Sequence, residues 1–450
     1  MNVLLVEPDY KNKYPPLGLM KISTLHKSRG DVIKFVKGCD RTIEINQFNR
    51  IYISTLFTFY WAKTIKTIKF YNRHKSERTP LYVGGVLATL FEDELAQQFK
   101  KIKIINGLIT NTQQLDLKPR IDFSKLVPDY EILETIDYHY PLSDAYMAYT
   151  TRGCVNRCGF CAVPKIEPIF KNYVSLFSQI PKDVQKKDLV LLDNNILASS
   201  QFSKIVSDIR KMGFTQNAKL GQKLRRVDFN QGLDARLFDS KKAALLAKLP
   251  MKVLRFSFDN VNLEDQYVRA IKLAVKAKFT KLCTYILYNY RDTPETLYKR
   301  LLINVSLGNK LGVEIASFPM RYIPLNAKNR KYTDNNWNLK FLRGVSSILL
   351  ATHGIVGGYE PFFKAAFGKD IAEFKQILSM PEIYIIYRKP YLKESKAWLK
   401  LYQELSIAQK KILYKTCDNP ISAGVISQEK DPLLRKIYKH YLKIKNPRKH

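Results

Sequence analysis

The sequence lacks the features that would place it in a membrane or outside the cell. No run in its 450 residues approaches the roughly eighteen apolar side chains of a spanning helix, and VSSILLATHGIVGG at 345–358 is too short and too polar. The amino-terminal MNVLLVEPDY has neither the basic segment nor the small-residue cleavage site of a secretory signal. These absences predict a soluble, cytoplasmic protein with no membrane partner.

Cysteine is also scarce, because the chain has only six, far fewer than a disulfide-rich scaffold. Three of them nevertheless fall within eight residues of TTRGCVNRCGFCAVPK at 150–165, where Cys154, Cys158 and Cys161 have the spacing C-x3-C-x2-C. Cys39, Cys283 and Cys417 are isolated and are predicted to be small buried apolar side chains. Clustered cysteines in a cytosolic chain point to metal binding or redox chemistry.

Acidic residues are the third shortage, with 40 Asp and Glu against 75 Lys and Arg, for a net charge of +35. Such an excess predicts a polyanionic partner, with nucleic acid the first candidate. The segment LLRKIYKHYLKIKNPRKH at 433–450 suits phosphate neutralisation with base stacking because it interleaves Tyr438 and Tyr441 with Arg435, Lys436, Lys439, Lys443 and Lys445. A Lys-rich composition on solvated faces, or a basic helix packed on its own protein, would give the same pattern.

The first hundred residues alternate short apolar runs with segments of helical spacing, which predicts βαβ units and a parallel sheet with helices on both faces. The predicted strands are 2–7, 32–36, 50–55, 80–85 and 101–106. A second series, separated by amphipathic helical segments, predicts most of a (β/α) barrel. Its six strands are 145–150, 188–193, 227–233, 252–259, 281–288 and 312–318.

Four regions follow from this pattern. We expect a doubly wound, Rossmann-like domain over 1–112, a polar connector over 113–143, a partial (β/α)6 barrel over 144–328 and a mainly helical, basic region over 329–450. The cysteine loop directly follows the first strand of the barrel, at the edge where barrels carry their active sites.

Three thiols without a nearby histidine do not complete a tetrahedral zinc site, and a disulfide would leave one of them over. A [4Fe–4S] cluster held by three cysteines keeps one iron open for an external molecule. The motif, with Phe160 just before its last cysteine, resembles the signature of the radical S-adenosylmethionine enzymes. The resemblance implies that Cys154, Cys158 and Cys161 bind the cluster. It also implies that the cluster, reduced by a donor such as flavodoxin or ferredoxin, cleaves S-adenosylmethionine to a 5′-deoxyadenosyl radical.

The resemblance also assigns cofactor contacts along the barrel. The polar residues after the second strand are expected to lie near the amino group of S-adenosylmethionine. Those after the third strand are expected near its ribose, its carboxylate or the substrate, and Phe160 is expected near its adenine. Asn289 stands in the fifth-strand region, which the resemblance places against the adenine of S-adenosylmethionine and where a glycine is common. Arg321 at the end of the sixth strand is a candidate substrate contact or a surface ion pair. The candidates after the second and third strands are Asp193, Asn194, Asn195, Asn230, Gln231, Asp234 and Arg236, of which some are alternatively helix caps, as Asp239 is expected to be.

The first domain resembles the cobalamin-binding domains that precede some radical enzymes, through Ser54 and Leu56 in S-x-L and the pair Gly84 and Gly85. The loop after the first strand, EPDYKNKYPPLG, has Lys11 where the resemblance requires the histidine that ligates cobalt. Cobalamin could therefore bind without that ligand, or the domain could serve in substrate contact or docking.

The sequence thus predicts a radical enzyme of unidentified substrate. Methylation or methylthiolation of RNA or DNA is one version, and modification of a peptide or small metabolite is the alternative. Two readings from other classes remain, a non-catalytic iron–sulfur protein that binds nucleic acid and a zinc-stabilised scaffold.

Overall fold

A computed structural model describes residues 1–181 and 185–442, which divide into two compact units. The first unit holds Met1–Arg255 and Ile323–Arg330. The second holds Phe256–Tyr322 and the chain from Lys331 onward. The predicted boundaries at 112 and 143 both lie inside the first unit, and the six predicted barrel strands are shared between the two units.

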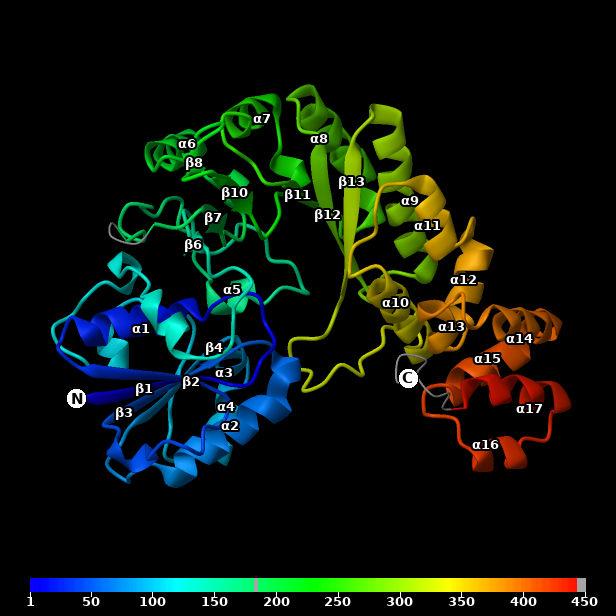
Figure 1. Cartoon of the computed structure of the whole chain (residues 1–450), viewed down its shortest axis with the longest axis horizontal. Helices are drawn as coiled ribbons and strands as arrows, with labels where there is room; N and C mark the ends of the chain where they lie inside the picture. The colour runs from blue at the N-terminus through cyan, green and yellow to red at the C-terminus, as the bar shows by residue number, and fades with distance from the viewer. Residues whose placement is uncertain (182–184, 443–450) are drawn as a thin grey trace. The chain divides into compact units, whose positions relative to one another are not determined.

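The first unit begins with a five-stranded parallel sheet in the order β2-β1-β3-β4-β5. Its strands are β1 (Asn2–Glu7), β2 (Val32–Lys37), β3 (Arg50–Thr55), β4 (Leu81–Gly85) and β5 (Lys103–Ile105). The intervening helices are α1 (Leu17–Lys27), α2 (Trp61–His74), α3 (Val86–Leu90) and α4 (Glu92–Gln98). Alternate side chains of β1 face opposite layers, since Leu4 and Val6 join the core that contains Ile65 and Ile68 of α2. Figure 1 shows α1 on one side of this sheet and α2 on the other. The predicted parallel sheet with helices on both of its faces is therefore present.

The polar segment that was predicted as a connector is an ordered part of this unit. It contains the short 3-10 turns Thr112–Leu115, Phe123–Lys125 and Glu131–Thr135. Asp129 accepts a hydrogen bond from Ser23 Oγ on α1 at 2.6 Å, and Tyr130 Oη accepts one from the backbone N–H of Met147 at 2.9 Å. The segment therefore packs between the five-stranded sheet and the strand that follows.

A second parallel sheet of the first unit has the order β10-β7-β6. These strands are β6 (Ala145–Ala148), β7 (Asp188–Leu191) and β10 (Arg226–Phe229), and the helices are α5 (Val163–Ile166), α6 (Phe202–Lys211) and α7 (Ser240–Leu246). Asp239 caps α7 by accepting from the N–H of Lys242 at 2.8 Å, as predicted. The antiparallel hairpin β8 (Lys219–Leu220) and β9 (Lys223–Leu224) was not predicted, because each strand is only two residues long and largely exposed.

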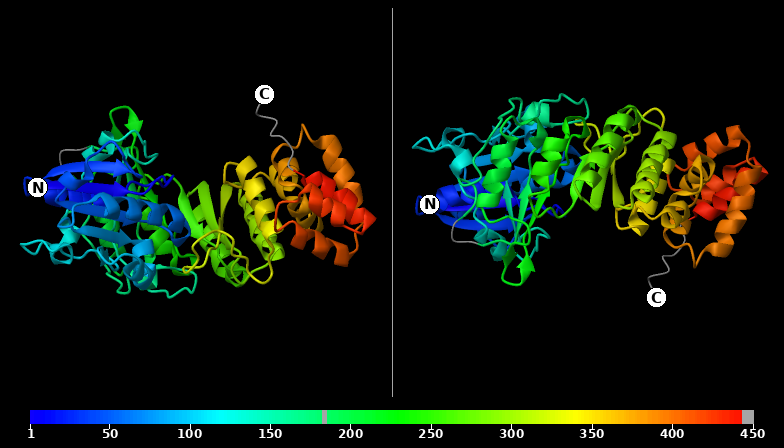
Figure 2. Two further views of the ribbon diagram at one scale, coloured as in Figure 1. Left: turned by 90° about the horizontal axis from the view of Figure 1, so that it is seen from below. Right: turned by 90° about the horizontal axis from the view of Figure 1, so that it is seen from above.

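A third sheet has the order β11-β12-β13, with β11 (Leu254–Ser257), β12 (Lys281–Tyr288) and β13 (Glu314–Arg321). The boundary between the units falls within β11, after Arg255, and β12 and β13 belong to the second unit. All six strands of the second series therefore exist, and they form two sheets of three. Helices make up the rest of the unit (Figure 2): α8 (Glu264–Lys276), α9 (Pro294–Leu311), α10 (Leu339–Ala351), α11 (Glu360–Phe367), α12 (Ile371–Ser379), α13 (Glu382–Ile386), α14 (Leu392–Glu404), α15 (Ile407–Thr416), α16 (Ala423–Gln428) and α17 (Pro432–Tyr438). No helix in the described part of the chain is both long and apolar enough to cross a membrane.

The tyrosines of the basic carboxyl-terminal segment belong to a hydrophobic core. Tyr438 is fully buried in a cluster with Trp398 and Leu434, and its hydroxyl lies 3.0 Å from Thr416 Oγ1. Tyr441 Oη donates to the backbone carbonyl of Ser379 at 2.5 Å. Both tyrosines thus pack on the protein itself, as the alternative for this segment expected, and the full burial of Tyr438 leaves its ring no face for stacking on a base. Lys443 and Lys445 lie outside the described residues.

Candidate functional site

The cysteine loop starts at the carboxyl end of β6, where two threonines fix it to the neighbouring strand. Thr150 and Thr151 are buried, and both their backbone N–H groups and both their hydroxyls donate to Asp193 Oδ1, which follows β7. The two hydroxyl bonds are 2.9 and 2.7 Å long. One carboxylate oxygen thus holds the start of the loop at the strand edge where parallel α/β sheets bind ligands.

Gly153 makes the next turn, and no other residue fits there. Its φ is +69°, and a Cβ would lie 2.5 Å from the carbonyl oxygen of Ile169. Glu167 completes the turn by accepting from the N–H of Gly153 at 2.7 Å and from Arg152 Nη2 at 2.8 Å. The loop is therefore shaped before the first cysteine.

The three cysteines follow in this loop, and each is partly exposed. Backbone N–H groups lie near two of the sulfur atoms, with Asn156 N 3.3 Å from Cys154 Sγ and Val163 N 3.5 Å from Cys161 Sγ. N–H groups directed at sulfur are a known means of tuning cysteine-held clusters. None of these thiols is in a disulfide. Among the residues described, no three His, Cys, Asp or Glu side chains are arranged as a set of metal ligands. The donor type and surroundings therefore fit an iron–sulfur cluster, although the thiols do not converge in this structure.

Asp234 connects the cysteine loop to the ends of β7 and β10. Its Oδ2 accepts from Asn156 Nδ2 at 3.0 Å and from Asn195 Nδ2 at 3.3 Å, and Arg236 donates to both carboxylate oxygens at 2.8 and 2.7 Å. Burial opposes the ionisation of Asp234, but the hydrogen bonds from Arg236 and Asn156 outweigh it and lower its pKa. The pKa of Arg236 is raised, first by Asp234 and to a smaller extent by the charges of Cys158 and Cys154. A cation is thus held beside two of the three sulfurs.

Two buried oxygen atoms at this edge have no hydrogen-bond partner among the described residues. They are Oδ2 of Asp193, which is 4% exposed, and Oδ1 of Asn195, which is 3% exposed. Burial raises the pKa of Asp193, against the hydrogen bonds from Thr151 and Thr150 that favour its ionised form. Because buried polar atoms are nearly always paired, two acceptors without partners at one strand edge indicate a site for a ligand that carries donors.

The other predicted residues of the first unit lie around this edge. Asn194 Nδ2 is 3.4 Å from Glu167 Oε2, Phe160 is partly buried and Gln231 is exposed. Asn230 directly follows β10, where its Oδ1 accepts from Tyr14 Oη at 2.5 Å. The structure thus brings together the polar residues that follow β6, β7 and β10.

Asn289 and Arg321 belong to the second unit. Asn289 is buried with φ +68°, a conformation that glycine adopts freely and that asparagine tolerates. Its amide donates to the carbonyls of Tyr322 and Tyr332 at 3.1 and 3.3 Å and accepts from the N–H of Asp334 at 2.9 Å. Arg321 Nη2 also donates to Tyr332 O, at 2.9 Å. Both side chains thus anchor the loop after β13, and their predicted ligand contacts stay predictions.

The residues predicted for cobalamin share the carboxyl edge of β3 and β4. Ser54 pairs in register with Gly84, and Leu56 is partly buried after β3. Gly85 has φ +104°, and a Cβ there would lie 2.2 Å from the carbonyl oxygen of Thr55, so the glycine is required by the sheet itself.

The edge of the neighbouring strand β1 is filled by the protein's own side chains. Glu7 is 1% exposed, and its carboxylate accepts from Lys37 Nζ and Tyr140 Oη, each at 2.5 Å, and from Asn12 Nδ2 at 3.0 Å. Lys37 also lies 4.3 Å from the ring centroid of Tyr138. The connector thus covers the β1 end of this edge.

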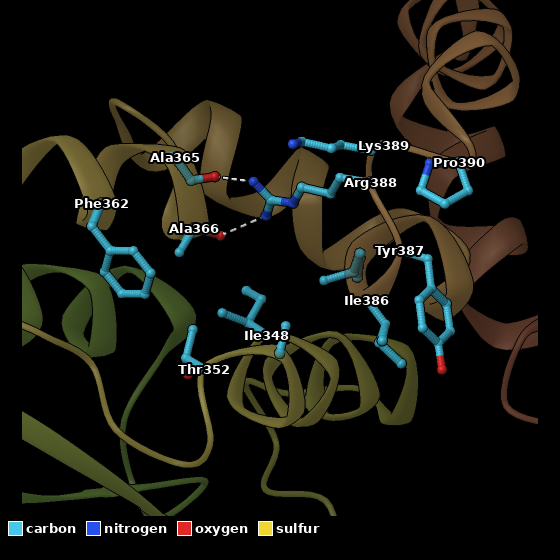
Figure 3. A pocket seen from close by; sticks show the side chains of 12 residues that line it. Ile348, Thr352, Phe362, Ala365, Ala366, Ile386, Tyr387, Arg388, Lys389 and Pro390 are labelled. Carbon is cyan, nitrogen blue, oxygen red and sulfur yellow. Dashed lines mark hydrogen bonds between the residues drawn. The ribbon is translucent and has the colours of Figure 1, made fainter. Parts of the chain in front are cut away.

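The second unit has a separate apolar hollow of about 400 Å³ between α10, α11 and the segment after α13. Ile348, Phe362 and Ile386 line it, and Arg388 closes one side by donating to the carbonyls of Ala365 and Ala366 (Figure 3). None of the predicted site residues lines this hollow.

Sequence reasoning missed Tyr14, Asn156 and Glu167 as residues of the site. Asn156 and Glu167 could have been suspected, because they lie within or just after the cysteine motif. Tyr14 carried no signal, since its partner is 216 positions away.

Comparisons with known proteins add little to this geometry. No protein-family model matches the chain, and no curated protein matches it. Among solved structures it is similar to HydG, described as a maturase of the [FeFe]-hydrogenase, at 12% identity and a TM-score of 0.35 over 70% of this chain and 90% of that one. The functional assignment therefore rests on the chain's own residues.

Proposed function

We propose that this protein is a radical S-adenosylmethionine enzyme whose cluster is held by Cys154, Cys158 and Cys161. The observation that carries the proposal is the three-thiol loop at the carboxyl end of β6, beside an edge where two buried acceptors have no partner among the described residues. When bound, the cluster supplies the electron that cleaves S-adenosylmethionine reductively.

The chain's own residues have separate tasks in this proposal. Thr150, Thr151 and Gly153 shape the loop, and Arg236 offsets the negative charge of the thiolates. Asp193 Oδ2 and Asn195 Oδ1 accept hydrogen bonds from the ammonium group of S-adenosylmethionine. That group has three N–H donors, which is enough for both oxygen atoms that lack a partner among the described residues.

Anaerobic reconstitution with iron and sulfide tests the cluster. We expect a brown protein that forms 5′-deoxyadenosine from S-adenosylmethionine under reduction, with activity reduced to background in Cys158→Ala. Cys39→Ala is the matched control, because it removes a thiol outside the loop. A colourless protein that binds zinc, or a brown one that leaves S-adenosylmethionine intact, would contradict the proposal in favour of the scaffold or the non-catalytic reading.

We further propose that the substrate is a nucleic acid, because one part of the first unit carries a dense excess of cations. Residues 203–255 include thirteen Lys and Arg, four Asp and no Glu. Nine of these cations are exposed, and seven of the nine have no carboxylate within ion-pair distance in the described part of the chain. This α6–α7 rim consists of Arg210, Lys211, Lys219, Lys223, Lys241, Lys248 and Lys252.

The rim is held together by contacts between its elements. Gln216 Nε2 donates to the carbonyls of Ala247 and Leu249 at 2.9 and 2.7 Å, which ties the segment before the hairpin to the end of α7. Arg225, after the hairpin, lies 3.8 Å from the ring centroid of Phe214 and donates to Met212 O. A rim of exposed cations, in a segment (203–255) whose aromatic side chains are all buried, suits a phosphate backbone rather than base stacking.

Charge reversal tests the rim. Lys219→Glu with Lys223→Glu is expected to weaken RNA binding about tenfold or more at low salt and to flatten its salt dependence, because each phosphate contact releases counterions. Lys66→Glu with Lys69→Glu on α2 makes the same charge change at exposed positions outside the rim. Equal losses in the two double variants would show a non-specific effect of net charge, and salt-insensitive substrate binding would favour a peptide or metabolite.

We propose that the domain formed by the five-stranded sheet serves in docking and does not bind cobalamin. Support comes from Lys11 in place of the histidine and from the filled edge of β1. Reconstitution with and without cobalamin is expected to give the same products, and a methylated product that requires cobalamin would contradict this.

A further inference from the structure

The loop between β1 and α1 connects the five-stranded domain to the candidate site through one tyrosine. Tyr14 Oη donates to Asn230 Oδ1 at 2.5 Å, across 216 positions of sequence. The backbone N–H of Asn230 donates to Leu191 O at 3.1 Å, at the end of β7. Asn230 is thus fixed on the strand side by its backbone and on the domain side by its side chain.

The position of Tyr14 is set by the loop around it. Pro15 and Pro16 are buried directly after it, and Asn12 Nδ2 donates to its carbonyl at 2.8 Å. Tyr138 Oη donates to Asn12 O at 2.7 Å, and Tyr10 is fully buried with its hydroxyl 2.5 Å from Thr64 Oγ1. A loop held by contacts within itself, to α2 and to the connector places the Tyr14 hydroxyl at little further entropic cost on ligand binding.

The hydroxyl is a donor at neutral pH, and its surroundings include further polar groups of β10 and β11. Burial raises the pKa of Tyr14, as does the charge of Asp228, while its bond to Asn230 and the charge of Arg255 lower it. Arg255 and Asp228 form a two-bond ion pair, with both bonds 2.8 Å long. Since Asn230 Oδ1 accepts from Tyr14, the orientation of the amide group is fixed.

We infer that Tyr14 is a positioning residue, by which the five-stranded domain holds the Asn230 amide in the orientation that contacts S-adenosylmethionine. This inference rests on the proposed function. The domain then contributes to the site directly, through the loop in which the cobalamin-binding domains carry their histidine.

The test compares variants in the full-length, cluster-loaded protein. Tyr14→Phe keeps the ring and removes the donor, so we expect the affinity for S-adenosylmethionine, measured by calorimetry, to fall about three- to tenfold. Iron content stays unchanged, and the KM for S-adenosylmethionine rises while kcat does not, which separates positioning from a loss of folded protein. Tyr60→Phe, which removes a hydroxyl from the same domain, is the control and leaves the affinity unchanged.

A double-mutant cycle provides a second readout that needs no activity. If the two residues act through one bond, Asn230→Ala and the Tyr14→Phe, Asn230→Ala double variant bind S-adenosylmethionine equally weakly. Additive losses, or wild-type affinity in Tyr14→Phe, would overturn the inference and leave the proposed function standing. A wild-type protein that forms its cluster yet binds no S-adenosylmethionine would instead overturn the proposed function and this inference with it.

Discussion

The first unit contains two parallel sheets, and their carboxyl edges differ in how buried polar groups are satisfied. At the end of β1 the Glu7 carboxylate has a lysine, a tyrosine and an asparagine as donors. At the end of β7 one oxygen of Asp193 accepts four hydrogen bonds, whereas its other oxygen and that of Asn195 accept none from the described residues. Both edges occupy the position where α/β sheets bind ligands.

The difference indicates what each edge is for. An orphan buried acceptor lowers stability by about 1–3 kcal/mol, so two of them together imply a compensating ligand. At the filled edge of β1 the Glu7 carboxylate has partners among the described residues, so its ion pair and hydrogen bonds contribute to stability without a ligand. Each edge therefore has its own expected response to substitution.

Removing the cation that pairs with Glu7 at the end of β1 should give the largest loss of stability. Lys37→Met keeps the aliphatic stem but leaves Glu7, which is 1% exposed, without its cation. We expect the free energy of unfolding to fall by about 3–5 kcal/mol, the usual cost of removing one partner of a buried ion pair. Urea unfolding followed by circular dichroism measures it.

The control for this substitution is Lys101→Met, since the pair of Lys101 with Glu77 is 66% and 88% exposed and should contribute less than about 1 kcal/mol. The affinity of folded Lys37→Met for S-adenosylmethionine should match that of the wild type. A stable variant with weakened affinity would show that the β1 edge, too, is a ligand site.

The comparison also shows which parts of the molecule the sequence could predict. Every strand of the two βα series was predicted, because β-branched apolar runs such as NVLLVE and KLCTYILY are buried on both faces of a parallel sheet. The place of Cys154 after β6 and of Asp193 after β7 followed from the same pattern.

What failed were features that depend on long-range packing. The sequence shows Tyr438 among cations, but only the fold buries it against Trp398. Likewise, nothing near Glu7 indicates that Tyr140, 133 positions away, will cover it. Local periodicity predicts elements and strand ends, whereas contacts between distant segments decide which edge is filled.

The open edge offers the sharper test, through Asp193→Asn. The amide oxygen can replace Oδ1 as acceptor for Thr150 and Thr151, while the charge and the orphan oxygen are lost. We expect the affinity for S-adenosylmethionine to fall about thirtyfold or more, as for removal of one partner of a buried charge pair, with only a small loss of stability at neutral pH. Binding calorimetry with the cluster-loaded protein measures the loss of affinity.

The pH dependence of stability distinguishes a buried Asp193 carboxyl with a raised pKa from a simple packing defect in Asp193→Asn. Because burial raises the folded-state pKa of Asp193 above its ordinary value of 3.8, the folded chain retains that proton longer than the unfolded chain. The contribution of Asp193 to wild-type stability is therefore greatest below that ordinary value and is lost as the pH rises toward the folded-state pKa. A carboxamide at this position does not titrate, so Asp193→Asn should be most destabilised relative to wild type in acid and least at neutral pH. A difference in unfolding free energy that stays constant with pH would contradict a raised pKa and would leave the orphan oxygen as an ionised group that the fold already compensates.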